Sequence, residues 1–124
     1  STSNIFFLVK DELVTPPLTG SILPGITRDS IIKLARKLGM KVSERRISID
    51  EILSSIDSGA MKEVFASGTA AVVSPVGLIR YKLKEYTVNG GIVGPVTEKL
   101  YNEILKIQYG EQDDPFGWRI KIAD

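Results

Sequence analysis

The strongest structural signal in the chain is the apolar run Ile5-Phe6-Phe7-Leu8-Val9. Five aromatic or aliphatic residues without a polar break indicate a buried strand rather than a helix. The polar residues Lys10-Asp11-Glu12 predict a turn. Leu13-Val14-Thr15 predicts the returning strand of a hairpin, which Pro16-Pro17 ends. Because a buried strand begins so close to Ser1, we expect further sequence upstream in the natural protein.

Further elements are predicted outward from this hairpin. Apolar residues at helical spacing predict a helix over 27–38 ending at a C′ glycine, Gly39. A capping box at Ser48 and Glu51 predicts a second helix ending near 58–59, and Pro95 as the first helical residue predicts a third. Strands are predicted over 41–47, 63–67 and 70–76, with an edge hairpin over 78–88. The apolar faces of the first and third helices are assigned to Ile31, Leu34, Ala35 and Leu38, and to Val96, Leu100, Ile104 and Ile107.

The order of these elements indicates the fold class. Strands and helices are mixed without strict alternation, so we expect an α/β or α+β fold with a mixed sheet and about three helices. The 124 residues are enough for a single domain over 1–124 and too few for two ordinary ones. A hydrophobic share of 43% and a charged share of 25% are typical of globular proteins.

The composition excludes several function classes. A net charge of +1 gives no general attraction to nucleic acid or to an anionic membrane surface. No apolar run approaches the roughly 20 residues of a membrane span, and no secretory signal is visible, so we expect a cytoplasmic protein. The absence of Cys and His excludes disulfides, thiolate or imidazole metal ligands and His-dependent catalytic triads. We expect no metal site, which leaves lysine, tyrosine, carboxylates, hydroxyls, backbone amides and a cofactor.

The segment Leu23-Pro24-Gly25-Ile26-Thr27-Arg28 contains the first candidate site. A glycine in a loop precedes a predicted helix whose first turn carries Thr27. Free amides at a helix N-terminus attract anions, and the threonine hydroxyl adds a donor, so this loop has the chemistry of a phosphate site. The alternative is an ordinary helix N-cap that binds no ligand. Taken alone, the loop sequence favours this alternative.

The segment Ser67-Gly68-Thr69-Ala70 contains the second candidate site, between two apolar strands. Amides and a hydroxyl at such a turn can form a nest for an anion. The alternative is a tight turn in which Gly68 supplies an unusual φ. Two anion sites in one small domain fit a phosphorylated cofactor together with a carboxylate substrate.

Several segments, taken together in this order and spacing, closely resemble the C-terminal part of branched-chain amino acid aminotransferases, which are class IV enzymes dependent on pyridoxal phosphate. The resemblance runs from Thr2 to about Trp118. It implies the C-terminal large domain of the D-amino acid aminotransferase-like fold. It also implies an enzyme that moves an amino group between leucine, isoleucine or valine and 2-oxoglutarate. The segments are Thr15-Pro16-Pro17-Leu18, 23–28, 63–70 and Gly94-Pro95-Val96-Thr97.

The resemblance implies cofactor contacts for five residues. In the family, amides after the Leu-Pro-Gly motif bind the cofactor phosphate, which corresponds here to Ile26 and Thr27 following Gly25. The leucine of that motif packs on the pyridine ring, which corresponds to Leu23. The threonine of the Gly-Thr-Ala motif also binds the phosphate, which corresponds to Thr69.

For the substrate, the resemblance implies that the turn amides at Ala70 meet the α-carboxylate and that Thr2 lies nearby. The expected partners are therefore small amino acids and 2-oxo acids. Ala71 and Ser74 stand where some relatives carry a redox-active cysteine pair. Thiol regulation of that kind is therefore excluded.

The residues that complete the family's active site are upstream of the matched part. These are the Schiff-base lysine, an arginine at the phosphate, a tyrosine of the substrate pocket and a glutamate that pairs with the pyridine nitrogen. We therefore expect a fragment, most of the C-terminal cofactor-binding domain of a longer enzyme, that holds no catalytic residue and is inactive alone. Strand edges left open in such a fragment favour self-association as a homo-oligomer.

Two alternative functions remain. The first is another class IV enzyme, such as a D-amino acid aminotransferase or aminodeoxychorismate lyase. Against it, the segments Thr15-Pro16-Pro17-Leu18 and Gly94-Pro95-Val96-Thr97 favour the branched-chain group. The second is a stand-alone ligand-binding or interaction domain that has lost catalysis, which leads if the 124 residues are the whole natural protein.

Overall fold

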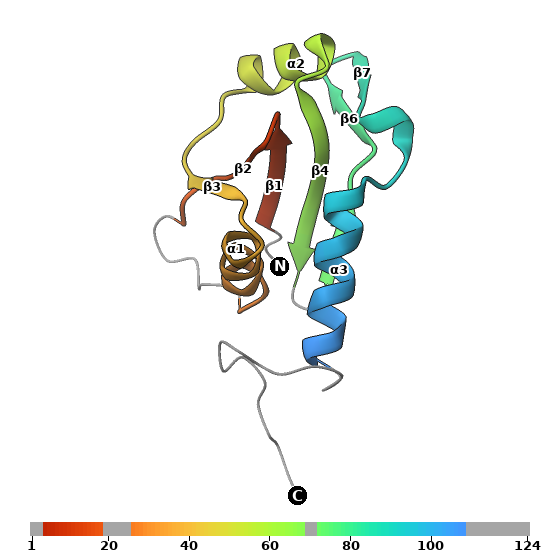
Figure 1. Ribbon diagram of the computed structural model, residues 1–124. Coiled ribbons are helices and arrows are strands. Elements are labelled where there is room, and N and C mark those ends of the chain that lie inside the picture. The colour runs from red at the N-terminus through yellow and green to blue at the C-terminus, as the bar shows by residue number, and fades with distance from the viewer. Residues whose placement is uncertain (1–3, 19–25, 69–71, 109–124) are drawn as a thin grey trace, which may run out of the picture.

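The computed structural model describes residues 4–18, 26–68 and 72–108 (Figure 1). The apolar run at the start of the chain lies in β1 (Asn4–Val9), and the returning strand is β2 (Glu12–Thr15). The two pair antiparallel, with Leu8 opposite Leu13. Lys10 at the turn has a φ of 57°. The predicted hairpin is therefore confirmed.

β1 is the central strand of a five-stranded sheet in the order β3-β2-β1-β4-β5. The other strands are β3 (Lys41–Glu44), β4 (Met61–Gly68) and β5 (Val72–Pro75). β3 runs parallel to β2, and all other neighbours are antiparallel, so the sheet is mixed as predicted. Both edges of β1 are paired, and the outer strands of the described sheet are β3 and β5.

Three α-helices pack on this sheet, as expected: α1 (Ile26–Lys37), α2 (Ile49–Ser58) and α3 (Pro95–Gln108). A short 3-10 turn, η1 (Asn89–Gly91), precedes α3. The local signals at the helix ends are confirmed. Gly39 has a φ of 89° after α1, the Ser48 side chain accepts from the Glu51 amide at 3.0 Å, and Pro95 is the first residue of α3.

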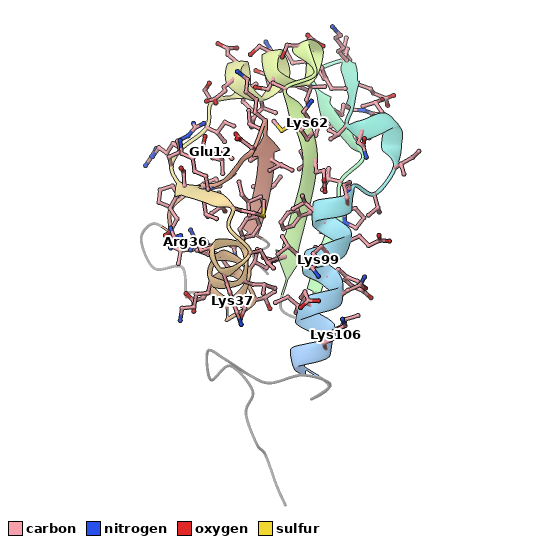
Figure 2. The ribbon with its side chains drawn as sticks, viewed as in Figure 1. Glu12, Arg36, Lys37, Lys62, Lys99 and Lys106 are labelled. Atoms are coloured by element: carbon pink, nitrogen blue, oxygen red, sulfur yellow. The ribbon has the colours of Figure 1, made fainter. Side chains whose placement is uncertain are left out.

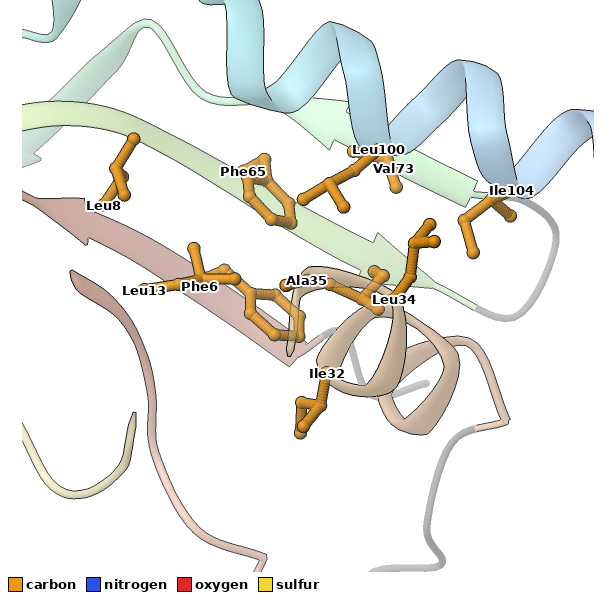
Figure 3. Packing of buried hydrophobic residues seen from close by; sticks show 11 residues of the cluster. Phe6, Leu8, Leu13, Ile32, Leu34, Ala35, Phe65, Val73, Leu100 and Ile104 are labelled. Atoms are coloured by element: carbon orange, nitrogen blue, oxygen red, sulfur yellow. The ribbon is translucent and has the colours of Figure 1, made fainter. Parts of the chain in front are cut away.

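Each face of the sheet carries its own apolar core. The strand residues alternate, so Phe6 and Phe65 face one side while Phe7 and Val64 face the other. Phe6 and Phe65 lie opposite each other on β1 and β4, and their rings stack with centroids 4.9 Å apart (Figure 3). The first core includes α1 and α3, and the second includes α2. Their helical members are Ile31, Ile32, Leu34, Ala35, Leu100 and Ile104 on the first side and Ile52 on the second.

Two predicted boundaries were wrong. Leu38, assigned to the buried face of the first helix, follows the last helical residue and is 43% exposed. The strand predicted over 41–47 ends at Glu44. The Arg45 amide makes a last bond to the Thr15 carbonyl at 3.0 Å. The partner strand β2 ends at that point, because Pro16 and Pro17 offer no N–H to continue the ladder.

The hairpin predicted over 78–88 forms, as β6 (Leu78–Tyr81) and β7 (Lys84–Thr87), but it is a separate two-stranded sheet rather than an edge of the main one. β5 ends at Pro75, and the Val76 amide bonds to the Val64 carbonyl at 2.8 Å. Gly77 then passes so close to Gly91 that a Cβ would be 3.0 Å from the Gly91 Cα.

Two other strand predictions are confirmed with shifted ends. The strand predicted over 63–67 extends to β4, and the described part of the one predicted over 70–76 is β5. The side chain of Ile107 lies outside the described residues.

Candidate functional site

Several strand ends share one end of the main sheet, and Figure 1 shows the start of β1 and the end of β4 at its lower side. β1 begins there at Asn4, which lies opposite Ser67 near the end of β4, and Ser67 in turn lies opposite Val73 of β5. β2 ends at the same edge, where the Thr15 hydroxyl donates to the Ile5 carbonyl at 2.8 Å. Because β3 is parallel to β2, it also ends there. We call this edge, where β1 begins and β2, β3 and β4 end, the site edge.

Arg28 fixes the start of α1 at the site edge. Its side chain is 5% exposed, and Nη2 donates to the Pro16 carbonyl and to Glu44 Oε1, each at 3.0 Å. Pro16 follows β2 and Glu44 ends β3. The first turn of α1 therefore lies at the carboxyl ends of two parallel strands, the place where α/β folds present a helix N-terminus to an anion.

The first turn of α1 carries the donors that the sequence predicted. Ile26 is the first helical residue, and Thr27 follows with a half-buried side chain. Amides in a first helical turn have no carbonyl partner within the helix. No side chain among the described residues caps α1, whereas Ser48 caps α2 and Glu63 caps α3. Among the described residues, the amides of Ile26 and Thr27 therefore have no side-chain capping partner.

The other predicted site residues lie outside the described part of the chain: Thr2, Leu23, Gly25, Thr69 and Ala70. Described chain neighbours of three of these segments lie at the site edge. Asn4 follows Thr2 closely, Gly68 precedes Thr69, and Ile26 follows Gly25. The structure therefore brings the flanks of both candidate anion sites to one edge, and a direct approach of Thr27 to Thr69 stays a prediction.

A class-level assignment comes from comparison with known proteins. The family model for amino-transferase class IV matches residues 1–79. The chain belongs to the class IV aminotransferases.

Relatives within class IV are similar over almost the whole chain. The probable branched-chain-amino-acid aminotransferase of Staphylococcus epidermidis is 52% identical over 119 residues, which covers 96% of this chain and 33% of the relative. Branched-chain-amino-acid aminotransferase 2 of Bacillus subtilis is 47% identical over 120 residues, covering 97% and 33%. The chain thus spans about a third of the length of the curated relatives that it matches.

Solved class IV structures have the same fold. The branched-chain amino acid aminotransferase of Escherichia coli matches with a TM-score of 0.80 and 38% identity, covering 98% of this chain and 36% of the other. The branched-chain aminotransferase of the thermophilic archaeon Thermoproteus uzoniensis, solved with norvaline, matches with a TM-score of 0.70 and 30% identity, covering 94% and 35%. Both comparisons confirm the predicted fold class.

A class IV reaction needs an amine near the cofactor, so the placement of lysines matters. Every lysine in the described part of the chain is exposed. Figure 2 shows Lys37, Lys62, Lys99 and Lys106 reaching outward from their elements. Lys99 and Lys106 both lie near Glu103, at 3.4 and 3.5 Å. No lysine among the described residues is therefore buried at the site edge.

The Arg45 side chain is paired with the carboxylate of Glu51. Its guanidinium donates to Glu51 at 3.1 and 2.9 Å. Hydrogen bonding to Glu51 raises the pKa of Arg45, and the same bond holds the pKa of Glu51 below its ordinary value. Glu51 therefore completes only half of the predicted capping box, because its carboxylate goes to Arg45 and not back to the start of α2.

Glu63, on the same strand as Ser67, has a structural role that the sequence did not predict. It is 5% exposed and accepts from the Val96 amide at 3.0 Å and from the Thr97 amide and hydroxyl at 2.7 Å each. A Cβ on Gly94 would lie 2.6 Å from Glu63 Oε1. Residues 63–70 and Gly94-Pro95-Val96-Thr97, two segments that carry the family resemblance, are therefore in contact. The Glu63 carboxylate of β4 caps the N-terminus of α3. The sequence signal that could have identified Glu63 is an acidic residue on the same strand face as the apolar Phe65.

Two hollows lie beside α3 and away from the start of α1. One of about 90 Å³ lies between Glu63, Gly77 and Gly91. A larger one of about 410 Å³ lies between β5 and α3 and is mostly apolar, with Val73, Tyr101 and Asn102 in its wall. The described lining of either hollow does not include Ile26 or Thr27, so the amide donors and not a cavity define the candidate site. Within the described ranges, the helices are too short or too polar to cross a membrane.

Proposed function

We propose that the chain is part of the C-terminal cofactor-binding domain of a longer branched-chain amino acid aminotransferase that uses pyridoxal phosphate. The observation that carries this proposal is the position of the first turn of α1, which Arg28 holds against Pro16 and Glu44 at the edge where β1 begins and β4 ends. The names of the Staphylococcus and Bacillus relatives support the substrate class. The proposed reaction exchanges an amino group between leucine, isoleucine or valine and 2-oxoglutarate.

The described donors fit the phosphate of this cofactor. The amides of Ile26 and Thr27, with the Thr27 hydroxyl, supply neutral hydrogen-bond donors at the positive end of a helix dipole. Gly25 would let the loop backbone approach the cofactor closely, Leu23 would pack on the ring, and Thr69 would add a second hydroxyl to the phosphate. When bound, the cofactor supplies the electron sink for the reaction.

The substrate is assigned to the same edge. In this assignment the amides of the turn at Ala70 would bind the α-carboxylate, and Thr2 would contribute to the same subsite. Gly68 and Asn4, the described neighbours of these residues, lie at the site edge. This placement orients the α-carboxylate from the main chain, so the side-chain pocket of the substrate is left to the upstream part of the enzyme.

The chain alone is expected to be inactive. A transaminase needs a lysine amine that holds the cofactor and moves a proton, and the described lysines are exposed. Borohydride reduction of the purified chain mixed with pyridoxal phosphate should give no stable adduct on a single lysine. Mass spectrometry of a peptide digest detects such an adduct, and finding one would contradict the proposal.

A substrate panel on the full-length parent separates the proposed enzyme from other class IV members. We expect turnover with L-leucine, L-isoleucine and L-valine and 2-oxoglutarate. Turnover with D-alanine, or lyase activity on aminodeoxychorismate, would assign the parent to another group. A full-length parent without any of these activities would favour a stand-alone binding domain.

Self-association and a cytoplasmic location remain part of the proposal. β3 and β5 are the outer strands of the described sheet, and each presents backbone groups on its outer side. Light scattering of the purified chain at rising concentration should show particles larger than 13.6 kDa. A constant monomer mass at high concentration would contradict the homo-oligomer.

A further inference from the structure

Ser67 is a buried residue whose hydroxyl lacks a partner in the described part of the chain. The residue is 1% exposed, and its Oγ makes no hydrogen bond there. A buried hydroxyl without a partner destabilises a fold relative to alanine at the same place. The apolar packing around β4 therefore does not explain why this position carries a serine.

The position of Ser67 points to the site edge. It lies between Asn4 and Val73 in the last row of the sheet that β1, β4 and β5 share, one residue before Gly68. Its side chain shares a strand face with Phe65, two residues earlier, and that face is covered by α1 and α3. α1 is also the helix whose first turn lies at this edge.

Resting on the proposed function, we propose that the Ser67 hydroxyl donates a hydrogen bond to an anionic oxygen of a ligand in the aminotransferase site. The oxygen belongs either to the cofactor phosphate or to the substrate carboxylate, since both ligands are assigned to this edge. Hydrogen bonds from a hydroxyl to a charged oxygen are short and strong. Such a bond supplies the partner that the hydroxyl lacks in the described chain.

The proposal separates ligand binding from folding. If Ser67 acts only on a ligand, replacing it by alanine removes an unpaired polar group from the ligand-free protein. The Ser67→Ala protein should then be as stable as the wild type, or more stable, without ligand. If Ser67 served only the fold, through a partner in the chain or a buried water, the same change would lower the stability of the ligand-free protein.

The test uses the full-length parent enzyme as wild type, Ser67→Ala and Ser67→Cys. Titrations measure the dissociation constants of pyridoxal phosphate and, with the cofactor bound, of 4-methylvalerate as a carboxylate probe. Loss of one hydrogen bond to a charged oxygen should weaken one of the two ligands by about tenfold or more. Weaker cofactor binding assigns the bond to the phosphate, and weaker binding of 4-methylvalerate assigns it to the carboxylate.

Ser55→Ala is the matched control, because Ser55 is also a buried serine, 8% exposed, but lies on α2 at the opposite face. Its two dissociation constants should stay within about twofold of the wild type. Unchanged constants in Ser67→Ala would overturn the proposal, and Ser67→Cys decides if the alanine variant does not fold. A wild-type parent that binds no pyridoxal phosphate would overturn the proposed function, and this inference with it.

Discussion

Glu63 Oε1 accepts two hydrogen bonds from Thr97, one from the backbone amide and one from the hydroxyl, each 2.7 Å long. The two residues are 34 positions apart. The contact joins the middle of β4 to the first turn of α3, and α3 also packs on β5. The strands on both sides of the predicted Thr69 turn are therefore held by one helix, whose own N-terminus depends on a single carboxylate.

Replacing Glu63 by alanine should lower the free energy of unfolding by about 3 kcal/mol, because three buried or half-buried donors lose their acceptor and a hollow is left beside α3. Urea unfolding followed by circular dichroism measures the change. Glu98→Ala is the control, since Glu98 is exposed in the same helical turn. It should cost less than about 1 kcal/mol, and equal losses in the two variants would refute the role of Glu63.

Gly94→Ala should destabilise the chain by about 2 kcal/mol, because the new methyl group would overlap the Glu63 carboxylate. Most of this loss should vanish when Glu63 is already alanine. A double-mutant cycle from urea unfolding of the four proteins gives the coupling between the two positions. Additive losses would mean that Gly94 matters for a reason other than the approach of Glu63.

Arg28→Lys should lower the free energy of unfolding by roughly 1–3 kcal/mol, since Nη2 of the buried guanidinium donates to both Pro16 and Glu44 and the shorter lysine side chain does not place its ammonium at that point. Arg36→Lys is the matched control on the same helix. Arg36 is 53% exposed and lies 4.0 Å from Glu44 Oε2, so its replacement should change stability by less than about 0.5 kcal/mol. Thermal unfolding compares the two variants, and a similar shift in both would contradict the anchoring role of Arg28.

The Arg45–Glu51 pair should make stability depend on pH in the acid range. The pKa of Glu51 is lower in the folded chain than its ordinary value of 4.5. The unfolded chain therefore takes up a proton first as the pH falls, and the stabilisation present above about pH 4.5 is lost as the pH falls through the folded pKa. Both side chains are partly exposed, so the effect is small.

Thermal unfolding between about pH 3 and pH 7 should show a flatter acid limb for Glu51→Gln than for the wild type. In an Arg45→Met background, Glu51→Gln should have little further effect on that limb. If Glu51→Gln flattens the limb equally with and without Arg45, the pKa of Glu51 is not set by this pair.

Local signals were enough to predict much of the fold. The apolar run at β1, the serine cap of α2 and Pro95 at the start of α3 each act within a few residues, and each was confirmed. The detachment of the β6–β7 hairpin was not predictable in this way. Where the hairpin leaves β5, Gly77 lies against Gly91, a residue adjacent to it only in the folded chain.

The residues of the candidate site also differ in whether a local sequence pattern predicts them. Ile26 and Thr27 were predicted because a glycine loop before a helix is a local pattern. Ser67 and Glu63 were missed because their roles come from alternation on β4 and from what covers that face. A serine in a strand and an acid beside apolar residues carry little information until the partner elements are placed.

The central position of β1 has a consequence for synthesis on the ribosome. Leu8 can pair with Leu13 as soon as both have left the exit tunnel, but its other neighbour, Glu63, is made much later. Until then, one side of the most apolar strand offers unpaired amides and carbonyls to any other nascent chain. Translation speed between Thr15 and Met61 should therefore govern how much newly made protein is lost to aggregates.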